Sequence, residues 1–344
     1  TSDRLDIVVG VKSKPKTPVM QQGVVAYRSG KLKTAEKFFR QAAKQDQSTA
    51  EPLNFLGYVL ALQRRYKEAA DVWKRATDFE DGGEIALNNY GVMRLASGDP
   101  DEAIEVFKRA TDRKSDFWRA YQNLGAAYSA KGNYSNALSA FRQSLTIKPD
   151  NAEAYNDIGH AYEKSGSKRE AMQSYEKALT INPELTIARY NLGLIRLQEG
   201  DLKGARRAFS RVLETDRNDV EALINVGYIQ GMEGEIDAAQ SSWKRALKID
   251  PNSAIARNNM GVAYYLKGKF DDALQSFELA AKADPKLSIT YNNRAAAHVK
   301  AGRLQQAIEA YNLALESNPI DYEAHRNLGL LYLKTKKPIK ASEH

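Results

Sequence analysis

The side chains in this chain best suited to contact a ligand are amides that recur every 34 residues. With one carboxylate among them, the series is Asn89, Asn123, Asp157, Asn191, Asn225, Asn259, Asn293 and Asn327. A primary amide carries both hydrogen-bond donors and an acceptor, so it can bind the C=O and the N–H of a peptide together. The series therefore predicts a site for extended backbone, with bonding to a neighbouring helix as the alternative use of each amide.

The amide series has exceptions, and they limit the binding of a ligand that the amides can provide by themselves. The first two copies carry Gln21 and Phe55 at this position, and Asp157 cannot donate a hydrogen bond when it is ionised. Each hydrogen bond contributes a net of about 0.5–1.5 kcal/mol. We therefore expect weak, sequence-tolerant binding from the amides, with specificity supplied by the residues around them.

Apolar residues on the same helix face predict that lining. Relative to the glycine that follows each amide, they lie six residues before, one residue after and four residues after. In the middle and late copies they are Ile187, Leu194, Leu197, Tyr228, Ile255, Val262, Tyr265 and Ile289. Exposed apolar surface of this extent marks a partner site. The alternatives are burial by curvature of the array and self-association of the protein.

Catalytic and metal chemistry find little support. Cysteine is absent, which excludes disulfides, thiol catalysis and cysteine metal sites. The four histidines, His160, His298, His325 and His344, occupy unrelated positions and form no metal-spaced pair with a carboxylate. No glycine-rich loop has the residues of a phosphate site. We therefore predict a protein that is not an enzyme and has no cofactor and no metal.

Charge and hydropathy limit the other partners. The net charge is +8, but the 51 basic and 43 acidic residues are interspersed, so we predict a protein or peptide partner and no nucleic acid. The late lysines Lys334, Lys336, Lys337 and Lys340 are interpreted as a solvated helix end. No apolar run approaches the roughly 18 residues of a membrane span. The expected chain is soluble, and the compartment stays open between cytoplasm and periplasm or envelope.

The period of 34 also organises the whole chain, because a fixed period in this range indicates stacked copies of one unit. Glycine recurs at Gly23, Gly57, Gly91, Gly125, Gly159, Gly193, Gly227, Gly261 and Gly329, with Ala295 in the ninth copy. Within one copy, apolar residues at 3–4 spacing predict a helix from Ala152 to Lys164 and a second from Lys168 to Thr180. Gly166 separates the two helices, and Pro183 follows the second.

Small and large residues alternate at fixed offsets from that glycine. Alanine lies twelve residues later in every copy, from Ala35 to Ala341. Sixteen residues after the glycine stand Phe39, Trp73, Phe107, Phe141, Tyr175, Phe209, Trp243, Phe277 and Tyr311. Such alternation favours interdigitated packing. We predict that the rings fill the core between one copy and the next.

This pattern resembles the tetratricopeptide repeat (TPR) family over residues 16–344. The Leu124-Gly125 pair, Tyr128, the alanine, the aromatic and the closing proline stand in the family's order. The resemblance implies an all-α, right-handed superhelical solenoid of about ten 34-residue helix-turn-helix repeats. It also implies a protein-binding scaffold. The asparagine series is similar to the ladder in the superhelical TPR domain of O-linked N-acetylglucosamine transferase, whose asparagines clamp backbone.

Three segments are expected. Residues 1–15 form an N-terminal arm that we expect to be disordered, residues 16–81 hold repeats 1–2, and residues 82–344 hold repeats 3–10, the last truncated. The glycines of Asp81-Gly82-Gly83 make that junction the expected hinge.

The predicted function is a non-catalytic scaffold that holds an extended peptide or a partner helix in its concave groove. One alternative is an envelope-associated bacterial assembly protein for pilus or secretion machinery, suggested by the missing cysteine and by a start at Thr1. Another is the regulatory array of a larger enzyme.

Overall fold

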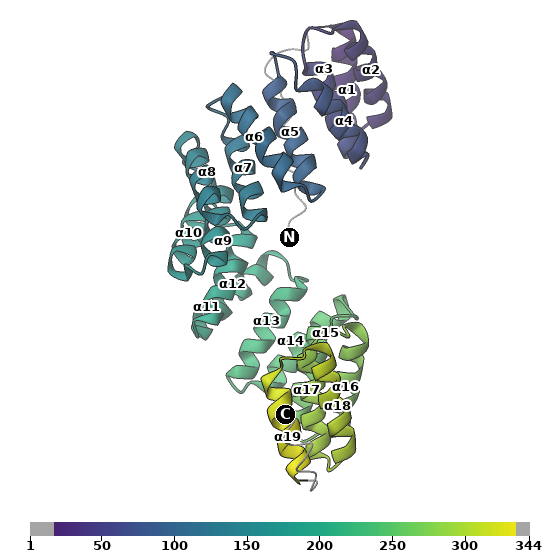
Figure 1. Cartoon of the computed structure of the whole chain (residues 1–344), viewed down its shortest axis with the longest axis vertical. Helices are drawn as coiled ribbons and strands as arrows, with labels where there is room; N and C mark the ends of the chain where they lie inside the picture. Colours follow the sequence, from purple (N-terminus) through teal and green to yellow (C-terminus); the bar gives the residue numbers. More distant parts are fainter. Residues whose placement is uncertain (1–16, 335–344) are drawn as a thin grey trace. The chain divides into compact units, whose positions relative to one another are not determined.

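The computed structural model describes residues 17–334, and all regular structure in that range is α-helical (Figure 1). The described helices are α1 (Pro18–Arg28), α2 (Leu32–Gln45), α3 (Glu51–Leu62), α4 (Tyr66–Ala76), α5 (Gly83–Ala96), α6 (Pro100–Arg113), α7 (Trp118–Ala130), α8 (Tyr134–Ile147), α9 (Ala152–Lys164), α10 (Lys168–Ile181), α11 (Thr186–Gln198), α12 (Leu202–Thr215), α13 (Val220–Met232), α14 (Ile236–Ile249), α15 (Ala254–Leu266), α16 (Phe270–Ala283), α17 (Ser288–Lys300), α18 (Leu304–Ser317) and α19 (Tyr322–Lys334).

Each copy of the repeat forms one helical hairpin, as the sequence predicts. In the fifth copy α9 has the predicted bounds, and α10 ends one residue later than expected, at Ile181. The turn glycine Gly166 has a φ of 84°, the left-handed conformation that glycine adopts without steric cost. Asp99 caps α6, because its Oδ1 accepts a hydrogen bond from the Glu102 amide at 3.1 Å. The predicted all-α solenoid of helix-turn-helix repeats is confirmed.

The described residues divide into two compact units. The N-terminal unit ends at Ala188 and the C-terminal unit begins at Arg189, so the boundary falls within α11. The segments expected from sequence, with a hinge between residues 16–81 and 82–344, stay a prediction. The expected arm of residues 1–15 lies outside the described residues.

The glycine-rich junction in the N-terminal unit is held by hydrogen bonds. The side-chain amide of Asn54 donates to the Gly82 carbonyl at 3.0 Å, and the backbone N–H of Ala50 donates to the Asp81 carbonyl at the same distance. One guanidinium nitrogen of Arg113 donates to the carbonyls of Thr77 at 2.6 Å and Phe79 at 3.1 Å. These bonds occupy backbone acceptors in the segment before the two glycines and at the first of them.

The core consists of the alanines and aromatics predicted from the period. Nine of the alanines are fully buried: Ala35, Ala69, Ala103, Ala137, Ala171, Ala205, Ala239, Ala273 and Ala307. The nine aromatic rings are buried as well. In the first eight copies the ring packs against the glycine of its own copy; a Cβ on Gly125, for example, would lie 2.6 Å from the ring of Phe141. Phe39 also stacks on Phe55 of the next copy, with ring centroids 5.0 Å apart.

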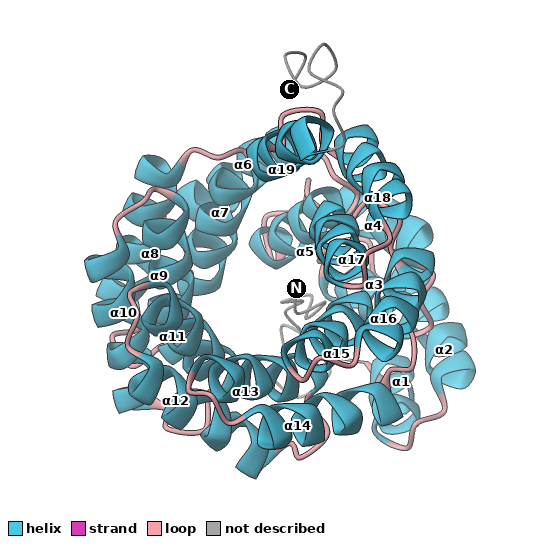
Figure 2. Ribbon diagram, turned by 90° about the horizontal axis from the view of Figure 1, so that it is seen from below, coloured by secondary structure: helices cyan, strands magenta, loops and turns pink. Residues whose placement is uncertain are grey.

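First helices form the inner side of each unit. In the N-terminal unit α5 contacts α7 and α7 contacts α9, while in the C-terminal unit α13 contacts α15 and α15 contacts α17. Successive second helices make no contact of that extent within residues 17–334. Figure 2 shows α13, α15 and α17 on the inner side of α14, α16 and α18. First helices, rather than second helices, therefore line the inner side of each unit.

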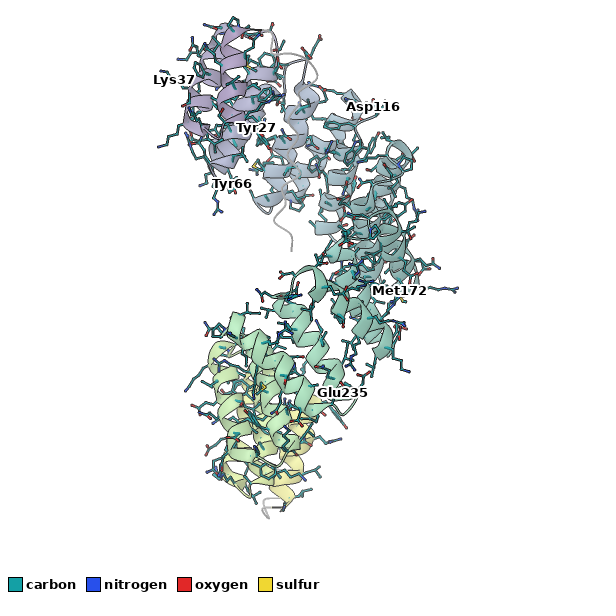
Figure 3. The ribbon with its side chains drawn as sticks, turned by 180° about the vertical axis from the view of Figure 1, so that it is seen from behind. Tyr27, Lys37, Tyr66, Asp116, Met172 and Glu235 are labelled. Carbon is teal, nitrogen blue, oxygen red and sulfur yellow. The ribbon has the colours of Figure 1, made fainter. Side chains whose placement is uncertain are left out.

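Charged side chains cover the outside of the hairpins. Lys37 on α2 and Asp116 before α7 are exposed and point into solvent (Figure 3). Glu235, at the start of α14, pairs with Arg206 of the preceding hairpin at 3.0 Å. Exposed pairs of this kind contribute little to stability, about 0–1 kcal/mol. The buried glycine–aromatic contacts, rather than the ion pairs, therefore hold the hairpins together.

Candidate functional site

The members of the amide series differ in burial between the two units. Asn89 on α5 is fully buried, and Asn123 on α7 is buried nearly as completely. The others are half-buried: Asp157, Asn191, Asn225, Asn259, Asn293 and Asn327. A fully buried amide offers no atom to a ligand in this conformation. Ligand contact by the series therefore stays a prediction for the half-buried members, five of which lie in the C-terminal unit.

The amides bond between neighbouring first helices. Asn123 donates to the Asn88 side-chain oxygen at 2.9 Å, and Asn293 donates to that of Asn258 at 3.0 Å. Asn225 donates to the Tyr190 hydroxyl, also at 3.0 Å. In each pair the partner precedes the amide by 35 residues. One position of α7, of α13 and of α17 is thus tied to the first helix of the previous copy.

Asp157 takes part in the same kind of contact as an acceptor. One carboxylate oxygen accepts from the Gln122 side chain at 2.7 Å, and the other accepts from Asn156 at 3.5 Å. Gln122 in turn accepts a hydrogen bond from Asn151 at 2.8 Å. A carboxylate, which only accepts when ionised, is satisfied here because glutamine supplies the donor. The exception in the amide series therefore has a structural cause.

The Tyr190 hydroxyl, which accepts the hydrogen bond from Asn225, is kept in one protonation state. Burial raises the pKa of the Tyr190 hydroxyl, although the hydrogen bond from Asn225 acts in the opposite direction. The hydroxyl therefore stays protonated at neutral pH and accepts through a lone pair. Asn225 donates in addition to the Glu221 carbonyl at 2.9 Å.

The partner position, three residues before the glycine, was missed by sequence reasoning. It carries Asn88, Gln122, Asn156, Tyr190, Asn258 and Asn292. These polar residues recur with the same period as the predicted series and stand directly beside it. Two adjacent polar positions on a helix that is otherwise apolar could have indicated side chains bonding from one copy to the next.

The predicted apolar lining is partly core. Leu194 and Leu197 are half-buried and pack against the cluster around Phe209. Val262 and Tyr265 are likewise half-buried against the cluster around Phe277. Tyr228 differs, since 45% of its surface is exposed. Leu197 and Tyr265, four residues after the glycine, therefore pack towards the second helix rather than the open side.

A continuous set of exposed apolar residues does occur on the first helices of the C-terminal unit. It occupies the positions six before, one after and five after the glycine, which share a helix face with the amides because they lie four, seven and eleven residues apart. We call this set the inner stripe: Tyr228, Met232, Ile255, Leu266, Ile289 and Leu330. Sequence reasoning missed Met232 and Leu266, because it followed the position four after the glycine instead of five.

In the N-terminal unit the same positions are polar on α7 and α9, whereas Leu62 on α3 is apolar and exposed. Arg119 on α7, and Glu153, His160 and Lys164 on α9, are all exposed. Ile187 on α11 is exposed and belongs to this unit by its contacts. The faces of α7 and α9 therefore differ in chemistry from the equivalent faces of α13 and α15.

Within residues 17–334 no group of histidines and carboxylates has the arrangement to hold a metal ion. His298 is buried and His160 exposed, while His325 Nε2 lies 3.0 Å from the Pro319 carbonyl. His344 and the lysines at 336, 337 and 340 lie outside the described residues. The longest helices have 14 residues, and no helix in the described range has the length and apolarity to cross a bilayer.

The chain belongs to the tetratricopeptide repeat family. Models described as tetratricopeptide repeat match residues 20–84, 85–117, 152–185, 187–219 and 233–288. A model described as TPR repeat matches residues 127–166 and 297–336. No curated protein sequence matches the chain.

Solved structures share the fold at low identity. A tetratricopeptide repeat protein from Parabacteroides merdae is 20% identical, with a TM-score of 0.58, over 72% of this chain and 98% of that one. PilF of Pseudomonas aeruginosa is 20% identical, with a TM-score of 0.55, over 62% and 96%. PilW, a type IV pilus biogenesis factor, has the same identity and TM-score over 61% and 98%. Tetratricopeptide repeats are scaffolds for protein interaction, so the fold is that of an interaction scaffold.

Proposed function

We propose that this protein is a non-catalytic scaffold whose C-terminal unit binds a protein partner on the inner stripe. The observation that carries the proposal is the exposure of large apolar side chains there, such as Ile255, with 54% of its surface exposed, and Ile289, with 48%. Burial of apolar area contributes about 25 cal/mol per Å². A partner that covers the stripe therefore gains free energy that the isolated chain leaves unused.

The contrast between the units supports this assignment. The equivalent positions of α7 and α9 in the N-terminal unit hold Arg119, Glu153 and His160, which are well solvated. A solenoid surface that needed only solubility would carry polar residues throughout. We infer that the apolar residues of the C-terminal unit serve an interaction.

The half-buried amides beside the stripe have a secondary part in this proposal. Asn225 and Asn293 already donate to neighbouring side chains. Their replacement is therefore expected to affect stability as well as binding, and binding data on them need a stability control.

The proposal is tested by site-specific photo-crosslinking in source cells. A photoreactive amino acid replaces Ile255 or Ile289 in the full chain, and Leu279 on α16 serves as the control, with 39% of its surface exposed on a second helix. We expect the same partner to be captured from positions 255 and 289 and not from 279. Equal capture from all three positions, or none from the stripe, would contradict the proposal.

The alternatives of a pilus or secretion assembly protein and of an enzyme-linked regulatory array stay predictions. PilF and PilW are 20% identical to this chain, a likeness that shows the fold. The identity of the captured partner distinguishes these alternatives.

A further inference from the structure

We propose that the occupant of the inner stripe is an amphipathic α-helix with one basic and one acidic flank, lying across α13, α15 and α17. This inference rests on the function proposed above and defines the class of partner. It follows from three features of the C-terminal unit: the hydrogen bonds already made by its amides, the spacing of its apolar residues and the charges at its borders.

Two amides beside the stripe already donate to neighbouring groups and offer fewer hydrogens to an extended peptide. Both hydrogens of the Asn225 amide are committed, one to the Tyr190 hydroxyl and one to the Glu221 carbonyl. The Asn293 amide donates to Asn258. A strand on this surface would bury backbone N–H and C=O groups against Tyr228 and Ile255 without partners, which is costly. A helix satisfies its own backbone and presents side chains alone.

The apolar residues stand one or two to a helix on neighbouring first helices. Tyr228 and Met232 lie on α13, Ile255 and Leu266 on α15, and Ile289 on α17. Helices in contact pack about 8–10 Å apart, and seven residues of an α-helix rise about 10.5 Å. Apolar side chains at heptad spacing on a crossing helix would therefore meet each first helix in turn.

The two outer positions of the stripe carry opposite charges on the helices where they are not apolar, acidic six residues before the glycine and basic five residues after it. Glu221 lies in the first turn of α13 and Glu323 in the first turn of α19, both exposed. Lys300 ends α17 and Lys334 ends α19, and both are exposed as well. None of these four side chains forms an ion pair within residues 17–334. A helix laid across the first helices would meet carboxylates along one flank and ammonium groups along the other, which sets its orientation.

The test is a selection from displayed peptides on the full chain. One pool holds 21-residue peptides (about three heptads) with apolar residues at heptad spacing and random Lys or Glu on the flanks. A second pool of the same size carries proline at every fourth position, which prevents helix formation. Binding of enriched peptides is then measured on the Ile255→Asp/Ile289→Asp double variant, with Leu279→Asp as the matched control. Circular dichroism and thermal melting confirm that each variant is folded.

We expect enrichment of heptad peptides with lysines on one flank and glutamates on the other. Their affinity should fall more than tenfold on the double variant and stay unchanged with Leu279→Asp. The Glu221→Lys/Lys300→Glu exchange variant should select the opposite arrangement of flanks.

Each of the other possible outcomes of the selection would reject a different part of the proposal. Enrichment of proline-containing peptides that lose affinity on the double variant would reject the helix and leave the proposed function in place. Peptides that bind the double variant as well as the native chain would reject the proposed function. Heptad peptides without a flank preference would reject the assignment of charges, and enrichment from neither pool would reject the helix.

Discussion

At the scale of single residues, the amide series has a structural role that its spacing alone did not reveal. Asn123, Asn225 and Asn293 each tie their helix to the previous first helix through a side chain 35 residues earlier. The period predicted that these residues lie on one face of the array. It could not predict their bonding, because a donor and an acceptor at a fixed step serve a ligand and a neighbouring helix equally well.

The bond between Asn258 and Asn293 is expected to stabilise the C-terminal unit. Replacing either residue by alanine should lower the free energy of unfolding by about 0.5–1.5 kcal/mol. In a double-mutant cycle, urea denaturation of both single variants and the double variant should give a positive coupling energy. Strictly additive losses would show that the 3.0 Å contact contributes nothing.

The contact between glycine and aromatic ring decides whether replacing a helical glycine by alanine raises or lowers the stability of the protein. Alanine has a better helix propensity than glycine by about 0.8–1.0 kcal/mol. In Gly125→Ala, however, the new Cβ meets the Phe141 ring at 2.6 Å, and overpacking costs about 1–3 kcal/mol. We expect a lower melting temperature for Gly125→Ala. We expect a higher one for Gly231→Ala, because the new Cβ would lie 3.6 Å from the nearest atom outside its own helix backbone, an ordinary van der Waals distance. Stabilisation by both changes would contradict the steric argument.

His298 predicts a pH dependence of stability. Burial lowers its pKa, Arg294 and Arg303 lower it further, and Glu309 opposes them. The unfolded chain, with an ordinary pKa near 6.5, therefore takes up the proton first as the pH falls. Stability is complete above that value and is lost as the pH drops towards the lowered pKa of the folded state.

Substitution of His298 by tyrosine, the residue at this position in four other copies, tests that dependence. Thermal melting of the His298→Tyr variant should fall less between pH 7.5 and pH 5.5 than melting of the native chain. An unchanged pH profile would assign the dependence to other groups.

At the scale of elements, helix ends follow local chemistry closely. Turn glycines from Gly30 to Gly302 adopt a left-handed φ between 72° and 84°. The second copy lacks this glycine, and Arg64 takes the same conformation with a φ of 61°. A residue with a Cβ is strained there, at a cost of about 1–3 kcal/mol.

Arg64→Gly is therefore expected to stabilise the protein, although glycine also loses more backbone entropy on folding. A net gain of about 0.5–1 kcal/mol is consistent with these opposing effects. Calorimetric melting measures it, and Gly132→Ala, at a φ of 75°, is the matched change in the opposite direction. A lower melting temperature for Arg64→Gly would mean that the arginine makes a compensating contact.

Much of the fold could be predicted from the sequence because it depends on local spacing. The bounds of α9 and α10, the cap at Asp99 and the buried alanines all follow from patterns within a single copy. Burial of Asn89 and the half-burial of Leu194 could not be predicted, since they depend on how neighbouring copies pack. The inner stripe was found in part, at Tyr228, Ile255 and Ile289, because the choice between four and five residues after the glycine requires the helix orientation.

At the scale of the whole molecule, stability is expected to be local. Within each unit neighbouring hairpins contact one another, and the contacts divide the described residues into two units. In such an array the loss of one core residue weakens adjacent repeats first.

Trp73→Ala tests this expectation. Trp73 is fully buried against Gly57, and its removal should cost about 3–5 kcal/mol. Hydrogen exchange should show lost protection in α1–α6 and retained protection in α13–α18. A uniform loss along the chain would indicate that the two units unfold as one.

The hydrogen bonds that amide side chains make between copies also limit which insertions and deletions the array can accept. Each bond joins the same two positions of consecutive copies, and these positions recur at a constant spacing of 34 residues. A deletion or duplication of one whole block inside the array brings an equivalent donor to an equivalent acceptor. The gene can therefore gain or lose blocks without breaking the register of its product, while an indel of any other size leaves one amide facing the wrong neighbour.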